Sequence, residues 1–260
     1  MTTDVRTTEA TTPQHRTRPA TGGRRTPMTR SRKLALVAGV AYLLTFVFSI
    51  PTLAMKAPLD DADFILGAGS TTGVTWAALF DFICGVAGIA SAVALYPVVR
   101  RQSRSSSLGF VVSRTLEGAI LTVGAIAVMA MVTLREDFVG AGAEAATSLN
   151  VTGQALLALH DWSFLFGPGM MPAINALLLG TIMYRSRLVP RWIPTLGLVG
   201  APMLIVSSLG TLFGIWDTPS LVTSLLVLPL ATWELSLGLR MTFRGFPPSP
   251  LLDEDALAPV

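Results

Sequence analysis

Residues 34–55 read LALVAGVAYLLTFVFSIPTLAM, and this run without a single charged side chain decides the class of fold. About 20 apolar residues in a helix cross the hydrocarbon core of a bilayer. The run follows a basic segment, so a cleaved secretory signal is the alternative interpretation. It is too long for the apolar part of a signal peptide, and no clean small-x-small cleavage site follows it. The stretch therefore predicts an uncleaved transmembrane helix.

The composition extends this prediction to the whole chain of 260 residues. Hydrophobic residues make up 51% and charged residues only 13%, whereas soluble domains carry about 25% charged residues. The sequence predicts an all-α integral membrane protein, a bundle of six transmembrane helices whose main partner is the lipid bilayer. The expected spans are Leu34–Met55, Val74–Val99, Gly109–Leu134, Trp162–Tyr184, Trp192–Trp216 and Ser220–Phe243.

The distribution of basic residues predicts the orientation. One side of the expected membrane holds Arg6, Arg16, Arg18, Arg24, Arg25, Arg30, Arg32, Lys33, Arg100, Arg101, Arg104, Arg185, Arg187, Arg191, Arg240 and Arg244. The other side holds only Lys56 and Arg135. An excess of Lys and Arg marks the cytoplasmic side, so both termini are expected in the cytoplasm of a bacterium with the spans in its plasma membrane. Because the charges lie at the ends of spans, the net charge of +3 does not indicate a nucleic-acid partner.

Three regions follow from this pattern. Residues 1–33 are rich in Thr, Arg and Pro and are expected to form a disordered basic cytoplasmic arm. Residues 34–246 form the predicted six-helix transmembrane domain. Residues 247–260 are an acidic, Pro-containing segment, expected to be a disordered cytoplasmic tail. Within the domain, residues 144–160 predict a short helix on the outer surface before the fourth span.

Charged residues within the spans need an explanation, since each costs at least about 2.5–3.5 kcal/mol near the bilayer centre. At about 1.5 Å of rise per residue they fall into an inner tier, nearer the cytoplasm, and an outer tier. The inner tier consists of Arg114, Glu117 and Glu234, and the outer tier of Asp81, His160 and Asp161.

In the inner tier, Arg114 and Glu117 are spaced i, i+3 and are predicted to pair on one helix face. Glu234 has no local partner and is predicted to be the carboxylate left over. With one cation and two carboxylates in a low dielectric, the second carboxylate should hold a proton or bind a cation. The pattern is typical of proton and ion relays, and equally of an ion pair that locks two helices.

In the outer tier, Asp81 shares a helix stripe with the small residues Gly85, Gly88 and Ala92. Small residues let helices approach closely, so Asp81 should face the bundle, either as a hydrogen-bonded packing residue or as part of a site. His160 is interpreted as an interfacial residue or as a titrating group. A mixed metal site of Asp81, His160 and Asp161 is a weak alternative, and the sequence predicts no metal.

The stretch ALHDWSFLFGPGMMPAIN, residues 158–175, predicts the start of the fourth span. Asp161 is expected to be its N-cap. Pro168 and Pro172, with Gly169 between them, remove helical hydrogen bonds and predict a kinked or partly unwound segment. Asn175 follows near mid-bilayer, where an amide is expected to hydrogen-bond across helices.

The chain lacks the motifs of known enzyme classes. The chain has no His-Glu-x-x-His, Gly-x-Ser-x-Gly, P-loop or dinucleotide-binding pattern. No catalytic residue and no cofactor is predicted, and an intramembrane enzyme is the least favoured of three classes. The other two are a transporter, taking a small molecule or cation in an ion- or proton-linked process, and a non-transporting regulatory or interaction protein whose buried charges specify helix packing.

Several blocks of sequence carry a resemblance to a known family. They are SRKLALVAGVAYLLTFVFSIP, DFILGAGS, VVSRTLEGAI, ALHDWSFLFGPG, IPTLGLVGAPMLIVSSL and WELSLGL. In this order they resemble the bacterial membrane family named domain of unknown function 4386, from about Ser31 to Phe246. The blocks include Glu117, His160, Asp161 and Glu234. The resemblance implies a multi-span bacterial inner-membrane protein and no particular activity.

Overall fold

The structure, a computed structural model, describes residues 28–61, 63–138, 143–217 and 219–252, and these residues form helices and no strand. The helices are α1 (Arg30–Met55), η1 (Ala57–Asp60), η2 (Phe64–Leu66), α2 (Thr71–Val99), α3 (Arg104–Asp137), α4 (Ala143–Phe164), η3 (Leu165–Met170), α5 (Met171–Ser186), α6 (Trp192–Leu212), α7 (Leu221–Phe243) and η4 (Pro250–Leu252). The all-α class is confirmed. Most of the arm (residues 1–27) and of the tail (residues 253–260) lies outside the described residues.

Six helical runs in the described part of the chain are long and apolar enough to cross a membrane. They match the six expected spans, and the fourth consists of α4, η3 and α5 in succession. Several begin at a side-chain cap. The hydroxyls of Ser70 and Ser103 accept hydrogen bonds from first-turn amides, and Ser220 forms a reciprocal capping box with Thr223.

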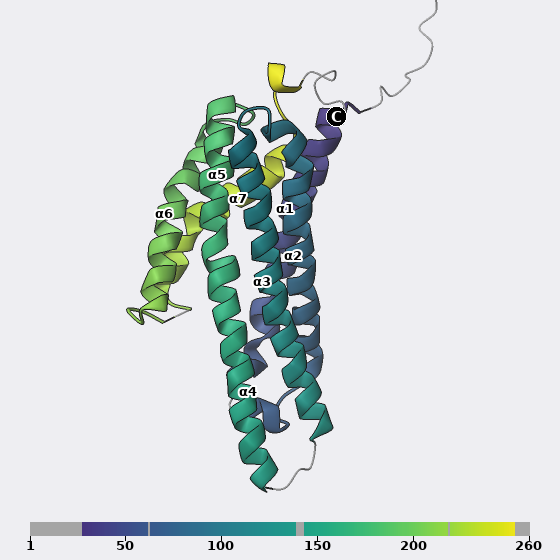
Figure 1. Cartoon of the computed structure of the whole chain (residues 1–260), viewed down its shortest axis with the longest axis vertical. Helices are drawn as coiled ribbons and strands as arrows, with labels where there is room; N and C mark the ends of the chain where they lie inside the picture. The colour runs from purple at the N-terminus through teal and green to yellow at the C-terminus, as the bar shows by residue number, and fades with distance from the viewer. Residues whose placement is uncertain (1–27, 62, 139–142, 218, 253–260) are drawn as a thin grey trace, which may run out of the picture.

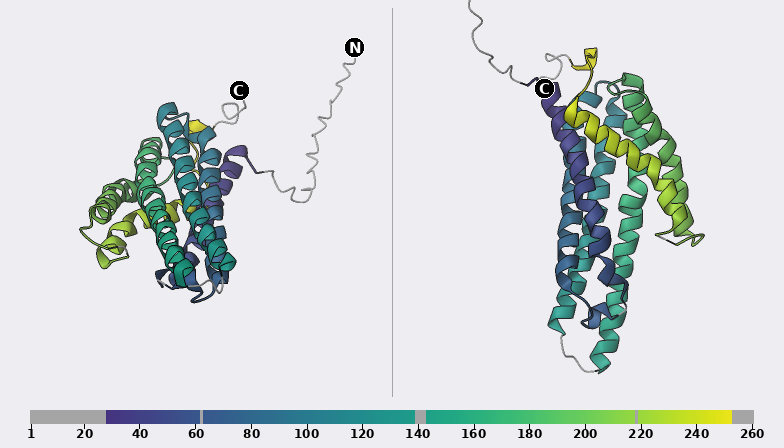
Figure 2. Two further views of the ribbon diagram at one scale, coloured as in Figure 1. Left: turned by 60° about the horizontal axis from the view of Figure 1, so that its bottom comes forward. Right: turned by 180° about the vertical axis from the view of Figure 1, so that it is seen from behind.

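The six runs are not equivalent in space (Figure 1). Helices α1, α2, α3 and the continuous α4–α5 form one long bundle, and α6 and α7 pack as a pair along one part of it. The start of α1 and the end of α7 lie together (Figure 2, right). There Arg32 donates from Nη1 to the carbonyl of Met241 at 2.7 Å and from Nη2 to that of Thr242 at 2.6 Å.

Glycines allow the closest helix contacts. A Cβ added at Gly118 of α3 would lie 2.9 Å from the carbonyl oxygen of Gly85 in α2, so the two backbones touch. The prediction that the small-residue stripe of α2 faces the bundle is confirmed, because Gly85, Gly88 and Ala92 are all buried. A Cβ at Gly39 of α1 would lie 2.5 Å from the backbone nitrogen of Thr242 in α7.

The loop between α1 and α2 is fixed by Arg135, near the end of α3. Its guanidinium donates to the carbonyls of Phe64, Gly67, Ala68 and Gly69 at 2.6–2.9 Å. It also lies 4.6 Å from the centre of the Phe64 ring. The guanidinium thereby supplies hydrogen-bond donors to loop carbonyls that the short 3-10 turns leave without a partner.

Two predictions about the fourth span are wrong. Residues 144–160 do not form a separate surface helix, because α4 runs from Ala143 to Phe164 and continues through η3 into α5. Asp161 lies inside this helix and is not its N-cap. The physical reason is that apolar side chains are needed only where lipid surrounds a helix. The backbone hydrogen bonds of the helix form between polar residues as readily as between apolar ones, so the helix extends beyond its apolar part.

The proline segment forms a π-helical stretch. Pro168 and Gly169 lie within η3, and Pro172 lies in the first turn of α5. The hydroxyl of Ser208 in α6 donates to the carbonyl of Gly169 at 2.7 Å, so a neighbouring helix meets one carbonyl of the irregular segment. Single-turn π segments are often found at functional sites. The kink itself stays a prediction.

Candidate functional site

Arg114 of α3 lies at the centre of the charged residues and bridges two carboxylates. Its Nη1 donates to Oε1 and Oε2 of Glu117 at 3.2 and 3.1 Å. Its Nη2 donates to Oε1 of Glu234 in α7 at 2.6 Å. The predicted pairing with Glu117 is confirmed, but the prediction that Glu234 is left without a partner is wrong. The planar guanidinium presents several donors in a fork and can serve two carboxylates at once.

Two further residues complete what we call the arginine cluster: Tyr42, Arg114, Glu117, Asn175 and Glu234. Asn175 of α5 donates from Nδ2 to Oε2 of Glu117 at 2.6 Å, which confirms the expected hydrogen bond across helices. The ring centre of Tyr42 in α1 lies 5.0 Å from the guanidinium carbon, within the range of a cation–π contact. The cluster thus joins four of the six membrane-crossing runs.

The arginine cluster holds one cation and two carboxylates, so it carries one negative charge in excess when all three are ionised. The side chains of Glu117 and Glu234 are 13% and 15% exposed, while that of Arg114 is 5% exposed. The carboxylates therefore have some access to the space around them, and the guanidinium is enclosed.

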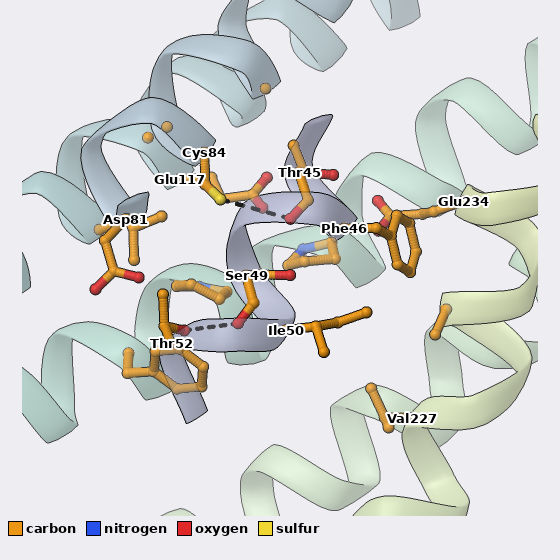
Figure 3. A pocket seen from close by; sticks show the side chains of 18 of the residues that line it. Thr45, Phe46, Ser49, Ile50, Thr52, Asp81, Cys84, Glu117, Val227 and Glu234 are labelled. Atoms are coloured by element: carbon orange, nitrogen blue, oxygen red, sulfur yellow. Dashed lines mark hydrogen bonds between the residues drawn. The ribbon is translucent and has the colours of Figure 1, made fainter. Parts of the chain in front are cut away.

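That space is a cavity of about 290 Å³ between the helices (Figure 3). Glu117, Glu234 and Arg114 contribute charge to its lining, and Asp81 contributes a further carboxylate. Most of the remaining lining is apolar or carries small hydroxyls, and it comes from every membrane-crossing run. In Figure 3, Phe46 and Ile50 of α1 face Val227 and Glu234 of α7. One cavity therefore reaches both the inner tier and one member of the outer tier.

Asp81 of α2 pairs with a residue that the sequence interpretation placed in a loop. The Nζ of Lys56, directly after α1, lies 2.6 Å from Oδ2 of Asp81. The same Nζ lies 5.5 Å from the ring centre of Phe164. Lysine stems reach along apolar surface towards a partner, so a lone lysine next to a span end was the signal that could have found this pair.

The rest of the outer tier lies elsewhere. His160 is buried, its Nδ1 is 3.0 Å from Oδ1 of the neighbouring Asp161, and its ring stacks on Phe164. Asp161 is exposed, and neither residue lines the cavity. Among the described residues no group of three or more His, Cys, Asp or Glu side chains could hold a metal ion. The alternative metal site of Asp81, His160 and Asp161 is therefore not formed.

Six membrane-crossing helical runs around a charged cavity define the class, a multi-pass membrane protein. A family model described as "Domain of unknown function (DUF4386)" matches residues 37–245, and the chain belongs to this family. Neither the curated proteins nor the solved structures include one that matches the chain significantly.

Proposed function

We propose that this protein is a proton- or cation-linked transporter of a small molecule in the bacterial plasma membrane, with both termini in the cytoplasm. One observation supports the proposal above the others. The cavity reaches a buried cluster that holds one more carboxylate than cation. Charged residues within a membrane are costly, and they commonly line substrate and ion pathways.

Glu234 is the carboxylate that we assign to the proton or cation. Glu117 has both oxygens occupied, since Arg114 contacts both and Asn175 donates to one. Within the described part of the chain, Glu234 accepts a hydrogen bond from the guanidinium at Oε1 and none at its second oxygen. Its second oxygen is therefore the better acceptor for a cation arriving from the cavity.

A second candidate is a non-transporting regulatory or interaction protein whose charges specify helix packing. It is favoured by the link that Arg114 makes between α3 and α7, because a buried ion network can fix how helices assemble. The two functions differ in whether the carboxyl group of Glu234 can be reached from the cavity in the folded protein.

Labelling with dicyclohexylcarbodiimide, an apolar reagent for protonated carboxyl groups, tests this difference. In nanodiscs containing the full-length protein we expect a stable adduct at Glu234, found by peptide mass spectrometry. Glu234→Gln should remove it. Glu117→Gln should also reduce it, because Arg114 and Glu234 then balance in charge. A folded protein that is labelled only in its loops, for example at Asp60, would refute the transporter and favour the packing role.

Topology can be tested with reporter fusions. Fusions at the N-terminus, at Ser105 and after Arg187 should report the cytoplasm, and fusions at Asp61 and Ala143 the outside. The reason is the concentration of Lys and Arg on one side of the expected spans. Alkaline phosphatase and green fluorescent protein give opposite signals at each position and serve as mutual controls. A single fusion on the wrong side would contradict the proposed orientation.

A further inference from the structure

The cavity is open on its side, between α1 and α7. Three of the residues that line it, Ile50, Leu53 and Val227, are 62%, 73% and 37% exposed, which is more than an enclosed cavity would leave. Ile50 lies roughly 24 Å along α1 from Leu34, and Val227 lies roughly 24 Å along α7 from Phe243. The hydrocarbon core is about 30 Å thick, so these residues meet lipid chains rather than water.

The arrangement of α1 and α7 explains the opening. At the cytoplasmic end the two helices touch, since Gly39 lies against Thr242 and Gly238 against Tyr42. The bonds from Arg32 to the last turn of α7 fasten the same end. Further along, α7 runs away from α1 (Figure 2, right).

The end of the cavity that faces the outer surface is covered differently. Lys56 reaches from the end of α1 to Asp81 of α2, and its ammonium lies near the ring of Phe164. The Lys56–Asp81 ion pair and the Phe164 ring therefore close this end, and a ligand from the outer water would have to separate them. The exposed apolar edge between α1 and α7 presents no such barrier.

We propose that the cavity takes an amphiphilic organic cation from the outer leaflet through the opening between α1 and α7. This inference rests on the proposed function. The ammonium group lies against the free oxygen of Glu234, and the apolar chain lies between Ile50 and Val227. The excess negative charge of the arginine cluster selects a cation, and the apolar lining selects the chain. At about 290 Å³ the cavity suits a small ligand, at the lower end of the range of about 300–1,000 Å³ for ligand pockets.

The ligand class can be tested with octyltrimethylammonium on the full-length protein in phosphatidylcholine nanodiscs, with empty nanodiscs as background. We expect saturable binding by calorimetry that Glu234→Gln weakens at least tenfold. Tetramethylammonium, which lacks the chain, and octanoate, which carries the opposite charge, should not bind at the same concentration. Equal binding of octanoate, or equal binding by Glu234→Gln, would overturn the proposed ligand class.

The route can be tested by narrowing the opening. Ile50→Trp and Val227→Trp should slow association of octyltrimethylammonium with immobilised nanodiscs at least tenfold. Val47→Trp is the matched control, since Val47 is exposed on α1 but does not line the cavity, and it should change the rate less than twofold. Unchanged rates in all three variants would refute the lateral route. If carbodiimide labels Glu234 but the amphiphile does not bind, the ligand class fails and the proposed function stands. If neither reagent reacts or binds, both fail.

Discussion

Arg114→Met is expected to lower the free energy of unfolding by about 3–5 kcal/mol, because it leaves buried charges without their partner. Arg114 is the only cation in contact with Glu117 and Glu234 among the described residues, and the three side chains are at most 15% exposed. Methionine is close in length and adds no charge, so the loss reports on the two stranded carboxylates rather than on a void. Equilibrium unfolding in mixed detergent micelles, compared with the wild type, measures it.

A neutral version of the cluster provides the control. In Arg114→Met with Glu117→Gln and Glu234→Gln, no charge remains in the arginine cluster, and most of the lost stability should return. The stability of Arg114→Lys should lie between those of the single and the triple variant, since an ammonium is a point charge and lacks the fork that reaches both carboxylates. If the single and triple variants were equally unstable, packing around Arg114 rather than its charge would determine the result.

The sequence predicted the six spans well, and the limits of the fourth span poorly. An apolar run such as residues 34–55 is selected by contact with lipid, and hydropathy detects such runs directly. The end of a helix depends instead on where its backbone bonds stop. In α4 they continue through His160 and Asp161 to Ala143, beyond the apolar part of the run. Polar residues in that segment interrupt the apolar pattern, and this suggested a separate helix. They do not interrupt the helix itself.

The candidate site divides along a similar line. Contacts within one helix follow from its period, and this is why Arg114–Glu117 and the inward stripe of Asp81 could be predicted. The contacts of Arg114 with Glu234 and of Lys56 with Asp81 join residues 120 and 25 positions apart. Such pairs depend on the tilt and order of the helices, which residue spacing does not encode. The cavity next to these two pairs also depends on the tilt and order of the helices.

Replacing both carboxylates should lower the free energy of unfolding by more than the two single replacements together. Glu117→Gln or Glu234→Gln alone leaves one carboxylate for Arg114, and each is expected to cost at most about 1.5 kcal/mol, the value of an altered hydrogen bond. In Glu117→Gln the arginine keeps a counter-charge, since Glu234 lies 2.6 Å from Nη2.

In the double variant Glu117→Gln and Glu234→Gln, Arg114 has no counter-charge, and we expect a loss of about 3–5 kcal/mol. Residues in one ion network commonly couple by about 0.5–3 kcal/mol, so the excess over the sum of the singles is the quantity to measure. The same micellar unfolding assay on the four proteins of the cycle gives it. Additive losses would show that the carboxylates act independently and that the excess charge has no role. A coupled loss would mean that either carboxylate can neutralise Arg114 while the other is released, which a site that binds and releases a cation requires.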